Sequence, residues 1–128
     1  MPHRSSLAPL LALAALVGLV SACGGGAPTG DLDKLQVTLS QFEVFVTNTS
    51  GHTLTDVVAE IVPAGPASHF VTRPEKLENG ESRHLAHTSF MDRDSLPFSR
   101  RNTKATRVTV TAKDVDGTIL RVDVPFKS

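Results

Sequence analysis

The sequence predicts an all-β fold, a single antiparallel β-sandwich of about seven strands that occupies residues 35–128. Apolar residues recur at every second position, as in Leu35–Leu39 and Phe42–Val46, which is typical of strands buried on one face. Clusters of Gly, Asn, Asp and Ser separate these runs at short intervals. No stretch after Cys23 keeps a helical period over three turns.

Residues 1–22 precede the predicted fold and have the three parts of an export signal. Arg4 and the amino terminus supply positive charge, Leu7–Val20 is an apolar run of 14 residues, and Ser21-Ala22 are small enough for a peptidase site. A transmembrane helix needs about 20 apolar residues, so this run is too short for a comfortable span. We expect a cleaved signal peptide. A general secretory signal and an uncleaved anchor are the alternatives.

Cys23 is the single cysteine of the chain, and it directly follows Val20-Ser21-Ala22. An aliphatic residue, two small residues and a cysteine resemble the lipobox of bacterial lipoproteins. The resemblance implies lipidation of the Cys23 thiol by diacylglycerol, cleavage after Ala22 and acylation, such as by palmitate, of the new amino group. Two or more acyl chains anchor a protein stably, because each buried methylene contributes about 0.8 kcal/mol. A membrane-anchored, extracytoplasmic location is therefore expected. Gly24 resembles the second residue of lipoproteins that reach an outer membrane and face the periplasm, where the cell has one.

Residues 23–34 begin with a Gly-rich run and lack apolar periodicity, so we expect them to form a flexible tether. The remaining residues suffice for one small hydrophobic core and cannot form an internal disulfide. After loss of the signal peptide, 12 Lys and Arg face 13 Asp and Glu. Such a balance gives no overall field that attracts nucleic acid, so no nucleic-acid partner is expected.

The expected strands follow the alternating runs along the chain. They cover Leu35–Leu39, Phe42–Val46, Val57–Ile61, Val108–Ala112 and Leu120–Phe126. Turn-forming residues punctuate them at positions 48–51, 63–66, 78–81 and 114–117.

One hairpin can be predicted in register. A three-residue loop at 115–117 pairs apolar residues with each other, so that Val110 lies opposite Val122, Ala112 opposite Leu120 and Val108 opposite Val124. A two-residue loop would place core and solvent residues on the same face. The longer loop also places Gly117 where a bulged hairpin requires a positive φ.

Three segments carry a resemblance to the immunoglobulin-like domains of bacterial extracellular proteins. Phe45–Gly51 resembles the turn that ends the second strand, Leu54–Val57 follows it, and Leu77–Ser82 resembles a turn before a later strand. The resemblance covers roughly Leu35–Phe126 and implies an immunoglobulin-like sandwich. It implies no activity, and the Cys…Trp…Cys core of antibody domains is absent from the sequence.

The histidines are candidate metal ligands. His84 and His87 are three residues apart, and such residues point to opposite faces of a strand unless a bulge intervenes. His52 and His69 lie elsewhere, no His-x-His pair occurs, and Met91 is the single methionine after Cys23. We expect no metal site and no cofactor.

Two fragments resemble catalytic or calcium-binding motifs. Asp114-x-Asp116-Gly117 begins like a calcium loop, but Pro125 occupies the position of the closing glutamate. Gly80–His84 begins like the nucleophile elbow of a serine hydrolase, but His84 replaces the second glycine and no helix is expected to follow. The sequence therefore predicts no catalytic residue.

The segment 92–107 is basic and has no clear period. Its cations are Arg93, Arg100, Arg101, Lys104 and Arg107. One interpretation is a contact surface for anionic lipid headgroups, glycan phosphates or an acidic partner. The other is a solvated loop whose Leu96 and Phe98 cap an open end of the sandwich. Carbohydrate stacking is disfavoured because the chain has neither Trp nor Tyr.

These observations predict a non-enzymatic envelope lipoprotein, anchored in the membrane through Cys23. Its sandwich would bind an envelope protein or support an envelope assembly. The alternative is a lipoprotein that binds a small ligand or metal through its histidines or through the basic 92–107 loop.

Overall fold

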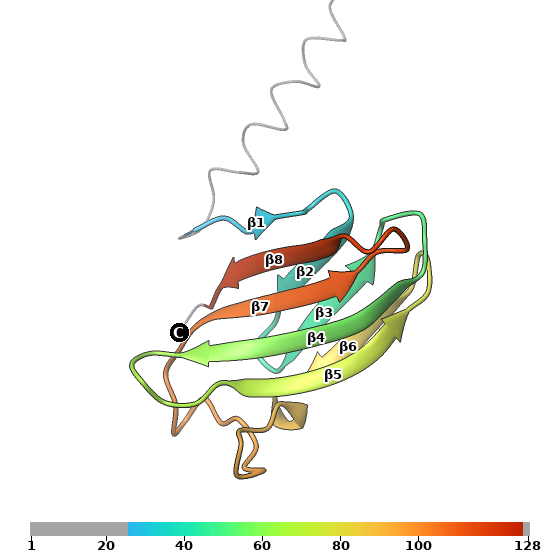
Figure 1. Cartoon of the computed structure of the whole chain (residues 1–128). Helices are drawn as coiled ribbons and strands as arrows, with labels where there is room; N and C mark the ends of the chain where they lie inside the picture. The colour runs from blue at the N-terminus through green and yellow to red at the C-terminus, as the bar shows by residue number, and fades with distance from the viewer. Residues whose placement is uncertain (1–25, 127–128) are drawn as a thin grey trace, which may run out of the picture.

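The computed structural model describes residues 26–126, which form two antiparallel β-sheets packed face to face (Figure 1). The predicted signal peptide and Cys23 lie outside the described residues. Within residues 26–126, the structure has no helix of the length and apolarity needed to cross a membrane.

The larger sheet has five strands in the order β1, β8, β7, β4, β5. Their bounds are Thr29–Gly30 (β1), Ile119–Pro125 (β8), Ala105–Lys113 (β7), Leu54–Pro63 (β4) and Phe70–Leu77 (β5). The smaller sheet has the order β2, β3, β6, with bounds Leu35–Leu39, Glu43–Asn48 and Ser82–Ala86. The predicted all-β sandwich is confirmed, with eight strands rather than about seven because the short β1 adds to the larger sheet.

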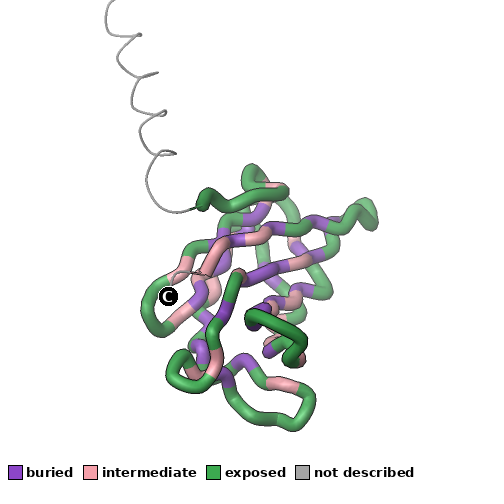
Figure 2. Tube along the Cα trace, turned by 90° about the vertical axis from the view of Figure 1, so that its left-hand side faces the viewer, coloured by how far each residue is buried: buried purple, intermediate pink, exposed green. Residues whose placement is uncertain are grey.

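The core lies between the two sheets and follows the period of two. Val44 and Val46 of β3 are fully buried, as are Val108 and Val110 of β7, because alternate side chains of a strand point to the same face. Buried and exposed stretches accordingly alternate along the strands (Figure 2). The apolar alternation in the sequence therefore marked the inner faces of these strands correctly, but not Phe42, which precedes β3 and is 69% exposed.

The hairpin of β7 and β8 has the predicted register. Val110 pairs with Val122, Ala112 with Leu120 and Val108 with Val124. The Asp114 N–H donates to the carbonyl of Thr118 over 2.8 Å, and Gly117 has a φ of 90°. The three-residue loop is thus the one that a bulged hairpin uses.

The amino-terminal boundary of the sandwich differs from the prediction. Thr29 and Gly30, expected in the 23–34 tether, pair with Asp123 and Val122 of β8. The Asp31 N–H donates to the Arg121 carbonyl over 3.0 Å, and the Arg121 N–H donates to the Asp31 carboxylate over 2.9 Å. Both β1 residues are exposed, so this edge strand buries no apolar side chain and has no alternation to detect. The sandwich therefore includes residues 29–34.

The two ends of the sandwich carry different connections. Connections 40–42, 64–69 and 87–104 lie at one end, where the described chain begins at Gly26 and ends after β8 (Figure 1). Connections 31–34, 49–53, 78–81 and 114–118 lie at the other. We call the first the basic end and the second the acidic end. Connections of the basic end hold four Arg or Lys and two carboxylates, and those of the acidic end hold six carboxylates and one lysine.

Candidate functional site

The longest connection, residues 87–104, joins β6 to β7 and forms most of the basic end. It starts with a single 3-10 turn, His87–Ser89. Phe90 and Phe98 then anchor it in the core, with exposed fractions of 0% and 2%, and the Phe98 N–H donates to the Phe90 carbonyl over 2.8 Å. The segment is thus an ordered loop that two buried rings hold against the core. In the solvated-loop interpretation of the sequence, the residues that cap the sandwich were Leu96 and Phe98.

The tip of this connection turns away from the core and is exposed. Met91 pairs with Val71 of β5 through two backbone hydrogen bonds of 2.8 and 3.1 Å. The Asp92 carboxylate then accepts from the N–H groups of Asp94 and Leu96, both over 2.9 Å. The Leu96 side chain is 59% exposed, so Phe98 packs into the sandwich and Leu96 does not.

Aromatic rings form a layer beneath the basic end. The Phe98 ring centroid lies 5.3 Å from that of Phe70 and 5.8 Å from those of His87 and Phe126. His87 and Phe126 are 5.5 Å apart. Such edge and tilted arrangements are the favoured geometries for aromatic pairs. The layer joins β5, the long connection and the residue after β8, three segments that are far apart in the sequence.

Arg100 covers this layer from outside. Its guanidinium carbon lies 5.3 Å from the centroid of the Phe126 ring, within the range of a cation–π contact. One guanidinium nitrogen also donates to the carbonyl of Gln41 in the β2–β3 turn over 3.0 Å. Arg100 is therefore exposed, but these two contacts fix the position of its side chain. The neighbouring Arg101 and Lys104 are exposed.

Two hollows flank Arg100 and Phe126. The larger, of about 460 Å³, is lined by these two residues, by apolar residues of β2 and β8, and by Gly26 and Pro28. The smaller, of about 400 Å³, lies between Phe126 and the segment 100–105, which includes Arg101 and Lys104. Three cations therefore line one hollow, and an aromatic ring forms part of its wall. This arrangement suits an anionic group attached to an apolar body.

His87 packs against Phe126, which lines both hollows, and is 6% exposed. Its Nε2 atom is buried and has no hydrogen-bond partner. Burial lowers the pKa of the imidazole, the Arg100 cation lowers it further, and the Glu43 carboxylate opposes the shift. The neutral imidazole therefore belongs to the aromatic layer. His84 lies on β6, is exposed and packs edge-on against Phe45, with ring centroids 4.6 Å apart.

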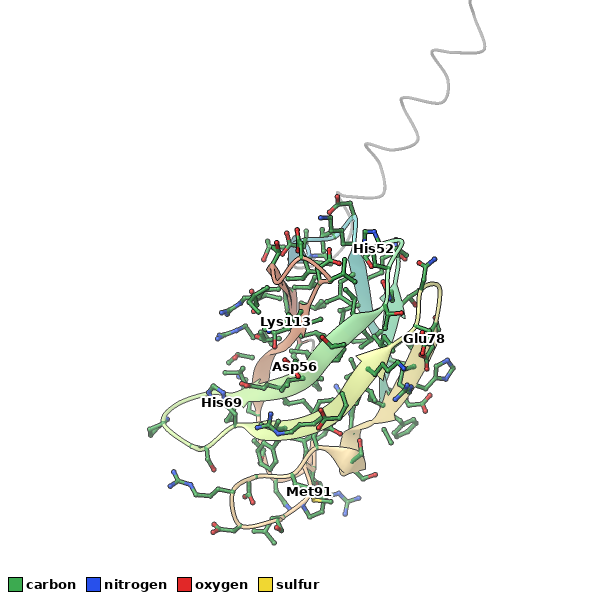
Figure 3. The ribbon with its side chains drawn as sticks, turned by 45° about the vertical axis from the view of Figure 1, so that its right-hand side comes forward. His52, Asp56, His69, Glu78, Met91 and Lys113 are labelled. Carbon is green, nitrogen blue, oxygen red and sulfur yellow. The ribbon has the colours of Figure 1, made fainter. Side chains whose placement is uncertain are left out.

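The other two histidines of the sandwich each lie beside a carboxylate. The Nδ1 atom of His52 is 3.4 Å from Asp114, and that of His69 is 2.9 Å from Glu60. Figure 3 shows His52 and His69 at opposite ends of the molecule. Among residues 26–126, no three metal-binding side chains gather in one place. The structure thus disperses the four histidines considered in the sequence.

The fragments that resemble calcium and hydrolase motifs have structural partners. Asp114 is buried and accepts from the Val115 N–H over 2.7 Å, whereas Asp116 accepts from the Thr118 N–H over 3.0 Å, which lowers its pKa. The Ser82 hydroxyl lies 2.5 Å from that of Thr47 on the adjacent strand. Ser82 begins a β-strand that pairs antiparallel with β3. A nucleophile elbow would place it between a strand and a helix.

Sequence reasoning singled out the basic segment but missed the residues that organise it. Phe126 was expected as one more inward strand residue, and nothing in the pattern connected it with Arg100 or His87. No family model matches the chain, and no significant match was found among curated proteins or solved structures.

Proposed function

We propose that the protein is a non-enzymatic envelope lipoprotein, anchored in the membrane by lipid on Cys23, whose sandwich binds an envelope protein or supports an envelope assembly. The observation that carries the proposal is the coincidence of the single cysteine with the end of an export signal. Where the cell has two membranes, Gly24 favours the outer one, with the domain facing the periplasm.

The position of Gly26 supports attachment at the basic end. A Cβ atom at Gly26 would lie 2.9 Å from the side chain of Pro125, so the described chain starts beside the end of β8. The three residue steps from Cys23 to Gly26 span at most about 11 Å, because an extended chain advances about 3.3–3.6 Å per residue. Lipid on Cys23 would therefore hold the basic end close to the membrane surface and direct the acidic end away from it.

The fold is compatible with a binding or structural role. The strands are antiparallel, and the chain crosses repeatedly between a three-stranded and a larger sheet, which supports the immunoglobulin-like resemblance. Val115 and Ile119 at the acidic end are 67% and 62% exposed. Exposed apolar residues directed away from the membrane are suitable contacts for an envelope partner.

A second candidate function is binding of a small anionic ligand. The observation that favours it is the hollow between Phe126 and the segment 100–105, where Arg100, Arg101 and Lys104 meet. The histidines lend no comparable support to a metal-binding role, because they are dispersed over the sandwich.

The anchor is tested by Cys23→Ser in the full-length protein. We expect the wild type to incorporate labelled palmitate and to stay with membranes after a carbonate wash, and the variant to lose both properties. A Ser21→Ala variant, which keeps a small residue at that position, is the matched control. Absence of palmitate from the wild type, or membrane retention of the Cys23→Ser variant, would refute the lipoprotein assignment. Crosslinking in intact envelopes then tests for a stoichiometric protein partner.

A further inference from the structure

We infer that the basic end of the sandwich binds anionic phospholipid headgroups of the membrane in which the protein is anchored. This inference rests on the proposed lipid anchor at Cys23 and names the partner of the basic end. It is argued from three features of the structure: where the chain enters the domain, how charge is distributed, and which apolar side chains accompany the cations.

The point of entry brings this end to the bilayer. Gly26 and Pro28 line the larger hollow together with Arg100 and Phe126, so the first described residues belong to the surface that carries the cations. A linker of only two residues between the lipidated position and Gly26 keeps that surface at a high effective concentration near headgroups. A weak affinity for headgroups would then suffice to fix the orientation of the domain.

The charge distribution favours the same orientation. Arg93, Arg100, Arg101 and Lys104 are exposed on the long connection, and one of its two carboxylates, Asp92, already accepts two backbone N–H groups. The acidic end carries six carboxylates and one lysine in its connections. A negatively charged surface would therefore attract the basic end and repel the acidic end, although the charges of the whole domain nearly cancel.

Two apolar side chains accompany these cations. Phe42, in the β2–β3 turn, is 69% exposed, and Leu96, at the tip of the long connection, is 59% exposed. Peripheral membrane surfaces combine basic side chains, which contact phosphates, with a few apolar side chains that enter the headgroup region. The structure places both kinds at the same end.

The smaller hollow offers a place for a headgroup phosphate. It is bordered by Arg100, Arg101 and Lys104 and has a volume of about 400 Å³. Arginine binds phosphate oxygens through parallel N–H donors, and lysine adds a mobile point charge. Arg100 is held by Phe126 and Gln41, so its cation occupies a fixed position beside the hollow.

The inference is tested with the full mature chain carrying Cys23→Ser, so that binding is measured without the lipid anchor. Co-sedimentation with vesicles of phosphatidylglycerol and phosphatidylcholine is compared with vesicles of phosphatidylcholine alone. We expect preferential binding to the anionic vesicles, which weakens as salt is raised. Arg101→Gln with Lys104→Gln should reduce this binding about tenfold or more, since each cation near an anionic surface contributes a several-fold factor.

The matched control is Lys76→Gln with Lys113→Gln, which removes the same charge from exposed lysines toward the acidic end. It should change vesicle binding by less than about twofold, because those lysines would face away from the bilayer. A further variant, Leu96→Ser, removes one of the exposed apolar side chains. It should weaken the binding to vesicles that is measured at high salt. Thermal unfolding of every variant verifies that the fold is retained.

Equal binding to both kinds of vesicle, or equal losses in the two double variants, would overturn the inference. An acidic protein captured at the basic end without vesicle binding would also overturn it. These outcomes are distinguishable from failure of the proposed function. Palmitate labelling of the wild type tests the anchor independently, whereas the vesicle assay uses a chain that has none.

Discussion

The two ends of the sandwich are closed in different ways. At the acidic end, turns are closed by polar side chains, and the fully buried Asn48 is the centre of the arrangement. Its amide nitrogen lies 2.7 to 3.1 Å from the carbonyl oxygens of His52, Leu77 and Glu78, and its oxygen accepts from the Ser50 N–H over 2.9 Å. At the basic end, a long connection is closed by aromatic rings, and its cations remain on the outer surface.

The difference is consistent with the proposal that one end of the sandwich is fixed and the other is a contact surface. The acidic end uses its polar side chains to satisfy backbone groups within the domain. The basic end uses apolar rings for its internal packing, and most of its Arg and Lys side chains therefore stay available for partners outside the domain. Three predictions test this comparison, from the largest expected effect to the smallest.

Phe98→Ala should produce the largest loss of stability. It removes the ring that contacts Phe70, His87 and Phe126, and truncation of a buried Phe costs about 3–5 kcal/mol. Urea denaturation followed by circular dichroism measures the change. Leu96→Ala, two residues earlier and exposed, is the control and should stay within about 0.5 kcal/mol of the wild type. Similar losses in both would mean that the long connection is not fastened by Phe98.

Asn48→Ala should have an intermediate effect, located at the acidic end. It leaves the carbonyls of His52, Leu77 and Glu78 without their side-chain donor, and we expect a loss of about 2–3 kcal/mol in unfolding free energy. Hydrogen exchange should show earlier opening of the 49–53 and 78–81 turns than of the 87–104 connection. Asn79→Ala, an exposed position in the 78–81 turn, is the control. Equal hydrogen-exchange rates at the two ends of this variant would contradict the expectation that Asn48 closes the acidic end independently of the basic end.

The smallest effect concerns pH and His87. Burial lowers the pKa of His87 in the folded state, so the unfolded chain binds more protons near and below its ordinary pKa of about 6.5. The contribution of His87 to the free energy of unfolding is thus fully present above about pH 6.5 and decreases as the pH falls below that value. His87→Gln should flatten this part of the stability profile, as measured by urea denaturation between pH 5 and 7.5. His52→Gln, exposed at the acidic end, is the comparison, and an equal flattening there would contradict the assignment to His87.

Local patterns predicted a large part of the fold. The β7–β8 hairpin was predictable in register because one register alone among those considered places Val110 and Val122 together and supplies Gly117 where φ is positive. The all-β class was predictable because alternation reports burial of one face of a strand. β1 was not predictable. Its two exposed residues are held by backbone hydrogen bonds, and these bonds produce no pattern of apolar side chains in the sequence.

The basic residues of the candidate site were also predictable from local sequence. The cluster Arg100, Arg101 and Lys104 indicated a basic surface from the sequence alone. Its partners were not visible, because Arg100 contacts Phe126 and the carbonyl of Gln41, 59 residues away in the chain. Buried His87 was expected on a strand, but it lies in the turn that follows β6.

The sequence by itself determined the alternating strands, the hairpin register and the basic composition of the long connection, and it predicts an export signal that precedes Cys23. Each depends on residues that are neighbours in the chain, so local spacing was sufficient. The tertiary structure alone decided that Gly26, Phe126 and the 87–104 connection share one end, opposite the carboxylate-rich turns. The physical reason is that strand order and crossovers between sheets decide which loops meet, and these depend on packing across the whole core.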